Sequence, residues 1–181
     1  ALVVDIGGGT SDFCVLRLGP DRASRIERRD DILSTAGVHV GGTDFDRQLS
    51  IARMMPHFGL GTGTADGKRN LPVWYFNDMA TWHRINQLYT PKVLRDIRSL
   101  MREAAEPDLL SRYEHLLVYR SGHRLAAQVE TAKIDLSDRD RAVIAFDEPG
   151  LRLDVPVSRS EFEAASADLV ARIGRSVDEA L

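Results

Sequence analysis

The chain has 181 residues, of which 43% are hydrophobic and 28% charged, an ordinary composition for a globular protein with a sizeable core. Its 24 basic and 27 acidic residues leave a net charge of −3, so the charge balance gives no support to nucleic-acid binding. The single cysteine, Cys14, excludes an internal disulfide, and no apolar run has the length of a transmembrane helix. We therefore expect neither a nucleic acid nor a membrane as partner.

The N-terminal quarter predicts a hairpin, a weaker pair of strands and a helix. Leu2–Ile6 reads as the first strand, Phe13–Leu18 as the second arm of a hairpin, and residues 26–40 as a weaker strand pair broken near "STAG". The stretch "GGTDFDRQLSIARMM" then changes to a helical period, with Thr43 and Asp46 resembling a capping box. Pro56 should bound or kink that helix.

The rest of the chain predicts a loop, a helical block, a hairpin and a last helix. "GLGTGTADGKRNLP" reads as a flexible loop, and Thr90 with Pro91 as a helix start. Three apolar stripes predict three helices: Val93, Ile97, Leu100 and Ala104; Leu109, Tyr113, Leu116 and Leu117; Leu125, Val129, Ala132 and Leu136. "AVIAF" and "LRLDVPV" read as strands joined by "DEPG", and Ser158 with Glu161 predicts the cap of the last helix.

Both ends of the sequence look cut. Ala1 opens inside an apolar run, and the last helical stretch ends without a Gly, Asn or Pro to terminate it. We expect the chain to be a piece of a longer protein.

The octapeptide "DIGGGTSD", Asp5 to Asp12, has the composition of a phosphate-binding turn. Glycine permits positive φ angles and close approach, so a strand followed by three glycines can gather backbone amides around an anion, and Thr10 can add a hydroxyl donor. The alternative is a plain hairpin turn between two acidic residues. A two-residue turn needs no third glycine and no threonine, so the pattern favours phosphate binding.

Asp5 and Asp12 add a reason to expect a metal at this turn. Two carboxylates beside bare phosphates would repel them, whereas Mg²⁺ held through its own waters would reconcile the charges. An aspartate in such a place can also orient the attacking water in phosphoryl transfer.

Three motifs together resemble the seventy-kilodalton heat-shock chaperones of the DnaK type. "DIGGGTSD" resembles the second phosphate motif of the actin-like ATPases, and "GGTDFD", Gly41 to Asp46, resembles the chaperones' Gly-Gly-x-Asp-Phe-Asp. "ETAKIDLS", Glu130 to Ser137, resembles their adenosine-contacting helix, and "SRSEFEAASADL" resembles the helix entry that follows it. These motifs cover most of the chain, and the branch they resemble most is the YegD-like group of divergent DnaK relatives.

The resemblance implies roles for named residues. Asp5 would hold water on Mg²⁺ and Asp12 would act near the transferring phosphate, the two being the catalytic candidates and Asp5 the metal candidate. The other positions that it places against ATP or ADP are Gly7, Gly8, Gly9, Thr10, Gly41, Gly42, Glu130, Lys133 and Ser137. The last three lie on one face of a helix, for which a solvated charged face is the alternative.

The sequence departs from the chaperone pattern in three places. Ile134 stands where those proteins have an arginine that stacks on adenine, which removes the cation–π contribution. Thr43 stands where an acidic residue is usual. Residues 59–120 form a longer block than the resemblance leads us to expect and are interpreted as an insertion. Within them, "GTADGKRN" suggests a Walker A loop but is one residue short and has Arg69 where Ser or Thr would bind Mg²⁺.

The sequence thus predicts an α/β fold, the second lobe of an actin-like (ribonuclease H-like) ATPase. Residues 1–40 would form part of the lobe's base with the phosphate motif, residues 41–165 an upper α+β subdomain with the helical insertion, and residues 166–181 a helix returning to the base. The resemblance implies a cytoplasmic chaperone whose intact ATPase domain hydrolyses ATP between two lobes, with this piece alone inactive. It also implies that a client protein or exchange factor would bind the upper subdomain. The alternatives are an actin-like filament protein and a partner-binding module with a vestigial nucleotide site.

Overall fold

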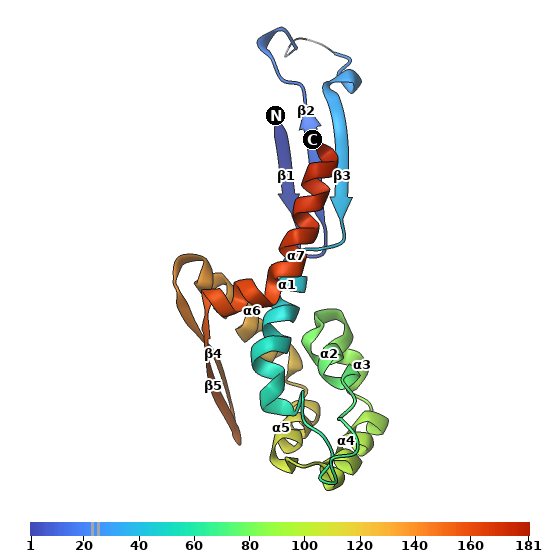
Figure 1. The fold of residues 1–181 in the computed structure, drawn as a ribbon, viewed down its shortest axis with the longest axis vertical. Coiled ribbons are helices and arrows are strands. Elements are labelled where there is room, and N and C mark those ends of the chain that lie inside the picture. Colours follow the sequence, from blue (N-terminus) through green and yellow to red (C-terminus); the bar gives the residue numbers. More distant parts are fainter. Residues whose placement is uncertain (23, 25) are drawn as a thin grey trace. The chain divides into compact units, whose positions relative to one another are not determined.

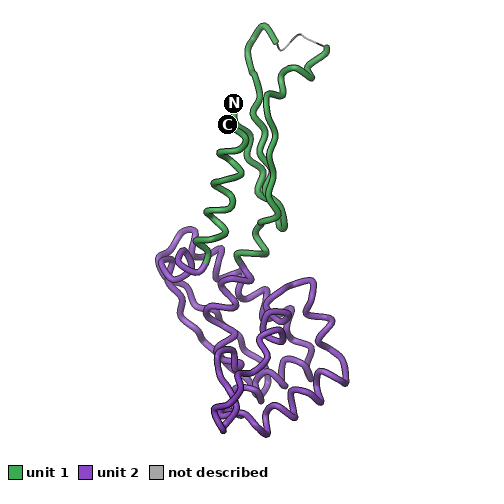
Figure 2. The backbone as a smooth tube through the Cα atoms, turned by 45° about the vertical axis from the view of Figure 1, so that its right-hand side comes forward, with its two compact units in different colours: residues 1–45, 166–181 green, residues 46–165 purple. Residues whose placement is uncertain are grey.

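The computed structural model describes residues 1–22, 24 and 26–181. Within these residues the protein is mixed α/β, with helices and small antiparallel sheets (Figure 1). The chain divides into two compact units, residues 1–45 with 166–181 and residues 46–165 (Figure 2). No helix in the described part of the chain is both long and apolar enough to cross a bilayer.

A three-stranded antiparallel sheet forms the first unit's frame. Its strands are β1 (Leu2–Ile6), β2 (Ser11–Leu16) and β3 (Ile32–Val38), with β2 in the centre. The predicted hairpin is confirmed. The predicted break near "STAG" is wrong, because β3 runs through residues 34–37, each of which pairs with a residue of β2. Between β2 and β3, the described residues include the 3₁₀ turns Pro20–Arg22 and Arg29–Asp31.

The C-terminal part of helix α7 (Arg159–Ala180) lies beside this sheet within the same unit (Figure 1). Phe13 on β2 is buried, as are Leu169 and Ala180 on α7. A guanidinium nitrogen of Arg172 donates to the His39 carbonyl at 3.2 Å, which ties the helix to the end of β3. The unit therefore has a thin apolar core.

The second unit is mainly helical. Helix α1 (Gly42–Leu49) leads into it and continues as a π-helical turn, Ser50–Met54, and a 3₁₀ turn, Met55–Phe58, which contains Pro56 and ends at the left-handed Gly59. The remaining helical elements are α2 (Trp74–Ala80), a 3₁₀ turn (Trp82–Arg84), α3 (Ile85–Leu88), α4 (Pro91–Glu103), α5 (Pro107–Val118) and α6 (Gly122–Asp138).

The core of the second unit is assembled from the predicted apolar stripes. Val93 and Ile97 of α4 are buried, and the Thr90 hydroxyl accepts the Val93 amide, which confirms this helix start. Aromatic side chains fill the space between α2 and α5, where Tyr113 is fully buried and meets Phe76 edge-on with ring centroids 5.4 Å apart. The large apolar side chains thus gather in this unit.

A two-stranded hairpin completes the second unit. Strands β4 (Arg141–Glu148) and β5 (Leu151–Ser158) pair along their whole length, as the sequence predicted. Alternate residues of β4 are buried, as expected for a ribbon with one face on a core. Gly150 turns the chain with a φ of 86°. At the end of β5, the Ser158 hydroxyl accepts the Glu161 amide and Glu161 accepts the Ser158 amide, which confirms the predicted capping box.

Candidate functional site

The glycine turn joins β1 to β2 and is fixed by backbone hydrogen bonds within the first unit. The Gly7 amide donates to the Thr10 carbonyl at 2.8 Å, which closes the turn. The Gly7 and Gly8 carbonyls accept from the amides of Gly42 and Thr43, at 2.9 and 2.8 Å. The turn is therefore held against the start of α1 by its carbonyl groups.

The fold itself does not explain why positions 8 and 9 are glycine. Their φ angles are not positive, in contrast to our expectation for this turn, since the positive-φ glycines of the described residues lie elsewhere. A Cβ atom at either position would meet no atom within 4 Å. Their amides donate to no partner among the residues that the structure describes. The two glycines thus leave two backbone donors without a partner among the described residues, and open space where their side chains would lie.

Gly41 is glycine for a different reason. A Cβ there would lie 2.5 Å from Gly8 C and from Gly9 N, so the two backbones cross where no side chain fits. The Gly41 amide donates to Asp44 Oδ2 at 2.9 Å, and the Thr43 hydroxyl donates to the Gly8 carbonyl at 2.8 Å. The predicted capping box of Thr43 with Asp46 is therefore wrong: Asp44 binds the amide before the helix, and Thr43 holds the glycine turn.

Asp5 and Asp12 are directly opposite each other on β1 and β2. Cross-strand partners project from the same face of a sheet, with Cβ atoms about 5 Å apart. Both carboxylates are exposed. In water the repulsion between the two carboxylates amounts to about 1 kcal/mol or less, so the fold can hold them side by side without a cation. Their combined negative charge would attract a cation.

A metal at this place would depend on few protein ligands. The described residues contain no group of three or more His, Cys, Asp or Glu that could hold a metal ion. Two carboxylates suit Mg²⁺, which keeps several waters and binds through one or two carboxylates and the phosphates of its substrate. Asp5 and Asp12 therefore fit a Mg²⁺ ion that is bound together with the phosphates of a substrate.

The second set of predicted site residues lies on α6, in the second unit. Glu130 and Ser137 are exposed and Lys133 is half-buried. Lys133 and Ser137 line an open pocket of about 410 Å³ together with Leu136, Arg159, Phe162 and Glu163. Glu130 lies outside the lining of this pocket, and Ile134 is exposed. The structure thus brings two of the three predicted residues to one pocket.

Lys133 forms an ion pair that the sequence did not suggest. Its Nζ lies 2.7 Å from Asp46 Oδ1, and less than a fifth of each side chain is exposed to solvent. Burial raises the pKa of Asp46; Lys133 opposes this shift, and the negative charge of Glu130 adds to it. The three residues therefore form one electrostatic group. The sequence-based prediction missed this group because it placed Asp46 in a capping box.

Arg159 lines this pocket, and sequence reasoning missed it. Its guanidinium donates to the carbonyls of Leu136, Ser137 and Arg139 at 2.9, 3.3 and 3.2 Å. These are among the carbonyls that a helix leaves without a partner at its C-terminus. Arg159 thereby fixes the end of α6 on which Ser137 lies. Its only sequence signal is its position two residues after the predicted strand "LRLDVPV".

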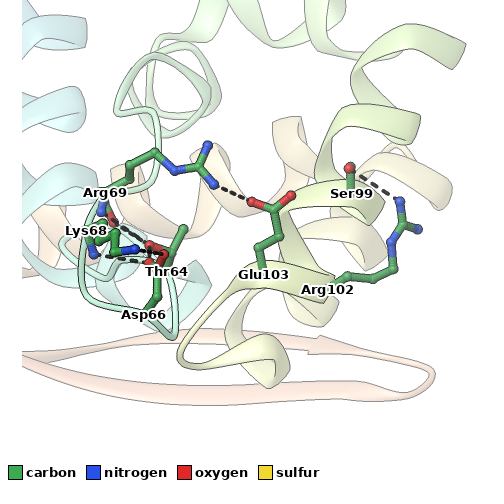
Figure 3. A network of polar contacts seen from close by, with 7 residues as sticks. All are labelled: Thr64, Asp66, Lys68, Arg69, Ser99, Arg102 and Glu103. Atoms are coloured by element: carbon green, nitrogen blue, oxygen red, sulfur yellow. Dashed lines mark hydrogen bonds and ion pairs between the residues drawn. The ribbon is translucent and has the colours of Figure 1, made fainter.

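The loop that suggests a Walker A motif is closed on itself (Figure 3). The Thr64 hydroxyl binds Asp66 and accepts the Arg69 amide, and the Gly67 amide donates to the Thr64 carbonyl at 2.9 Å. Arg69 also forms an ion pair with Glu103 of α4. These donors are already used within the protein, so the loop is not arranged to hold phosphate, in agreement with the sequence argument.

No family model matches the chain. It is 26% identical over 189 aligned residues to the chaperone protein DnaK of Deinococcus deserti and 25% identical over 182 to that of Cyanidioschyzon merolae. The DnaK of Guillardia theta is 26% identical over 187 residues. Each match covers 99% of this chain but only 21% of the relative.

The chain thus spans about a fifth of the length of the curated relatives that it matches. The matches name the family that the three motifs had indicated, and they extend over both structural units. The identities are low, but the similarity along the whole chain supports a relation to the DnaK chaperones.

Proposed function

We propose that this chain is part of the ATP-binding and ATP-hydrolysing domain of a DnaK-type chaperone, in its YegD-like branch. It would form the greater part of the second lobe of an actin-like ATPase. Residues 1–40 and 166–181 would belong to the base of the lobe, and residues 41–165 would form the upper subdomain. The phosphates of ATP or ADP would lie against the turn between β1 and β2.

The observation that carries the proposal is the open backbone at Gly8 and Gly9. Nothing within the described residues requires glycine at these two positions, and their amides have no partner there. A ligand that approaches the backbone closely and accepts amide hydrogen bonds accounts for both facts, and phosphate oxygens are such acceptors. The neighbouring Thr10 hydroxyl would add a donor.

The remaining predicted residues around the turn would act as its frame. The amides of Gly7, Gly41 and Gly42 donate within the protein, so these glycines would line the site through close approach of their backbones. Asp5 and Asp12 would accept hydrogen bonds from the water ligands of Mg²⁺, and one of them would orient the attacking water. When bound, Mg²⁺ would neutralise charge on the phosphates.

The pocket on α6 would take the adenosine. Glu130, Lys133 and Ser137 would contact the ribose hydroxyls, with Asp46 holding the Lys133 ammonium in place. Exposed Ile134 offers the base an apolar contact in place of cation–π stacking. In the full-length protein, nucleotide state would be coupled to a client or exchange factor at the upper subdomain, in the cytoplasm as for DnaK-type chaperones.

Two measurements test this proposal. In the full-length protein, Asp5→Asn should lower Mg²⁺-dependent ATP turnover at least tenfold, whereas Asp154→Asn, at an exposed carboxylate on β5, should leave turnover unchanged. Equal turnover in both variants would contradict the proposal. The 181-residue chain alone should bind ATP weakly or not at all, since phosphoryl transfer depends on groups from both sides of the phosphates. Low-micromolar affinity in calorimetry would contradict this second expectation.

A further inference from the structure

Gly37 on β3 lies next to the carboxylate of Asp12. Strand β2 is central, so Asp12 is opposite Asp5 on one side and opposite Gly37 on the other. Residues that are directly opposite in neighbouring strands project from the same face. Asp5, Asp12 and Gly37 therefore form one row across the sheet.

The Asp12 carboxylate occupies the space that a side chain at position 37 would need. A Cβ on Gly37 would lie 2.9 Å from Asp12 Oδ1 and 3.9 Å from its Cγ. The φ angle of Gly37 is not positive, so the backbone conformation does not demand glycine. Glycine in the interior of a strand is unfavourable because it loses more backbone entropy on folding. The contact with Asp12 is therefore the tightest constraint that the structure places on this residue.

We propose that Gly37 is a positioning residue for Asp12. Its missing side chain lets the Asp12 carboxylate lean over β3, on the side of β2 opposite to Asp5. The two negative charges are thereby kept apart, and the face between them stays open for the hydrated cation. This inference rests on the proposed nucleotide site, whose acidic pair it explains.

Gly37→Ala tests the inference because it changes the site without unfolding the sheet. The crowded atom is the end of a rotatable side chain, which can move away, whereas the nearest backbone atom outside the chain neighbours is the Ser11 carbonyl oxygen, at 3.6 Å from the new Cβ. We expect an unchanged or raised Tm, since alanine restricts the unfolded chain more than glycine does. In the full-length protein, kcat for Mg²⁺-dependent ATP hydrolysis should fall about tenfold, and the Mg²⁺ concentration for half-maximal rate should rise. KM for ATP should change less.

Gly19→Ala is the matched control. A Cβ at Gly19 would lie 2.6 Å from Asp21 Oδ1, so this substitution also displaces an aspartate carboxylate, one that lies outside the proposed site. Its kcat and Mg²⁺ dependence should equal those of the parent protein.

A second comparison separates positioning from a general structural role. In an Asp12→Ala background, Gly37→Ala should cause no further loss of turnover, because the carboxylate on which it acts is gone. An equal loss with and without Asp12, or a Tm that falls in both backgrounds, would overturn the inference. So would full Mg²⁺-dependent activity in Gly37→Ala. Absence of ATP hydrolysis from the parent protein would instead overturn the proposed function, and this inference with it.

Discussion

Gly9 lies in the turn between β1 and β2 and Gly41 packs against that turn, yet different physical constraints apply to them. The space where a Gly41 Cβ would lie is occupied by backbone atoms of Gly8 and Gly9, whereas the space at Gly9 is empty. A sequence shows only that both are glycine. At the residue scale, therefore, structure separates a glycine needed for folding from one that the fold leaves unexplained.

Gly41→Ala should lower the free energy of unfolding by about 1–3 kcal/mol, because backbone atoms 2.5 Å away must move to admit the new methyl group. Gly9→Ala should change it by no more than about 0.5 kcal/mol, since nothing is displaced. Urea unfolding of the 181-residue chain measures both values. Equal destabilisation by the two substitutions would contradict the assignment of open space to Gly9.

Lys133→Met should destabilise the protein by about 1–3 kcal/mol, because Asp46 then keeps a largely buried charge without its ion-pair partner. Adding Asp46→Asn should restore part of that loss. A double-mutant cycle in urea checks this expectation, and a coupling energy near zero between the two positions would contradict it.

The stability of Lys133→Met should depend on pH through the pKa of Asp46. A carboxyl group whose pKa is raised in the folded state favours folding most below its ordinary value of 3.8, and this contribution is lost as pH rises through the folded-state pKa. The stability of Lys133→Met relative to the parent should therefore fall as pH rises from the ordinary value of 3.8 through the folded-state pKa of Asp46.

At the element scale, the helix ends show how local pattern and tertiary contact compete. Ser158 and Glu161 form the predicted capping box because both are local to the start of α7. At α1, the same kind of pattern failed, because Thr43 donates to the Gly8 carbonyl of the distant glycine turn and Asp46 pairs with Lys133 of α6. A capping motif is thus predictive where no distant partner offers a better contact.

Glu161→Gln should remove a stabilising contribution that depends on pH. Hydrogen bonds from the Ser158 amide, and then from its hydroxyl, hold the pKa of Glu161 below its ordinary value of 4.5. A carboxylate with a lowered folded-state pKa stabilises the fold above its ordinary value, and loses this effect as pH falls through the folded-state pKa. The Tm difference between parent and variant should therefore be constant at neutral pH and shrink below about pH 4.5. A difference that grows on acidification would contradict the assignment.

At the scale of the whole molecule, apolar burial is unevenly divided. The main hydrophobic cluster runs from Leu49 to Val157, entirely within the second unit, and includes the fully buried Met54, Phe58 and Tyr113. All five residues of β1 are exposed. Regions with little buried apolar surface open at lower free energy than a packed core.

Hydrogen exchange of the 181-residue chain should follow this division. Amides of α5, which carries Tyr113 and Leu116, should exchange slowest, and those of β1 should exchange orders of magnitude faster, because little burial opposes local opening there. Exchange measured by mass spectrometry checks the prediction. Equal protection of β1 and α5 would show that the first unit is stabilised by something other than its apolar core.

The sequence by itself determined the elements whose signals are local. The β1–β2 hairpin, the apolar stripes of α4, α5 and α6, the β4–β5 hairpin and the α7 cap all follow from residue periods and neighbouring capping groups. The same holds for the glycine turn, because three consecutive glycines between two aspartates can be recognised without coordinates. Local chemistry of this kind depends on residues within a few positions of one another.

Tertiary structure decided which distant groups meet. Pairing with β2 made β3 one continuous strand, the crossing of two backbones fixed Gly41, and packing joined Asp46 to Lys133. It also placed Asp12 between Asp5 and Gly37. None of these contacts has a local sequence signal, because the energy of each depends on a partner that only the folded chain brings within reach.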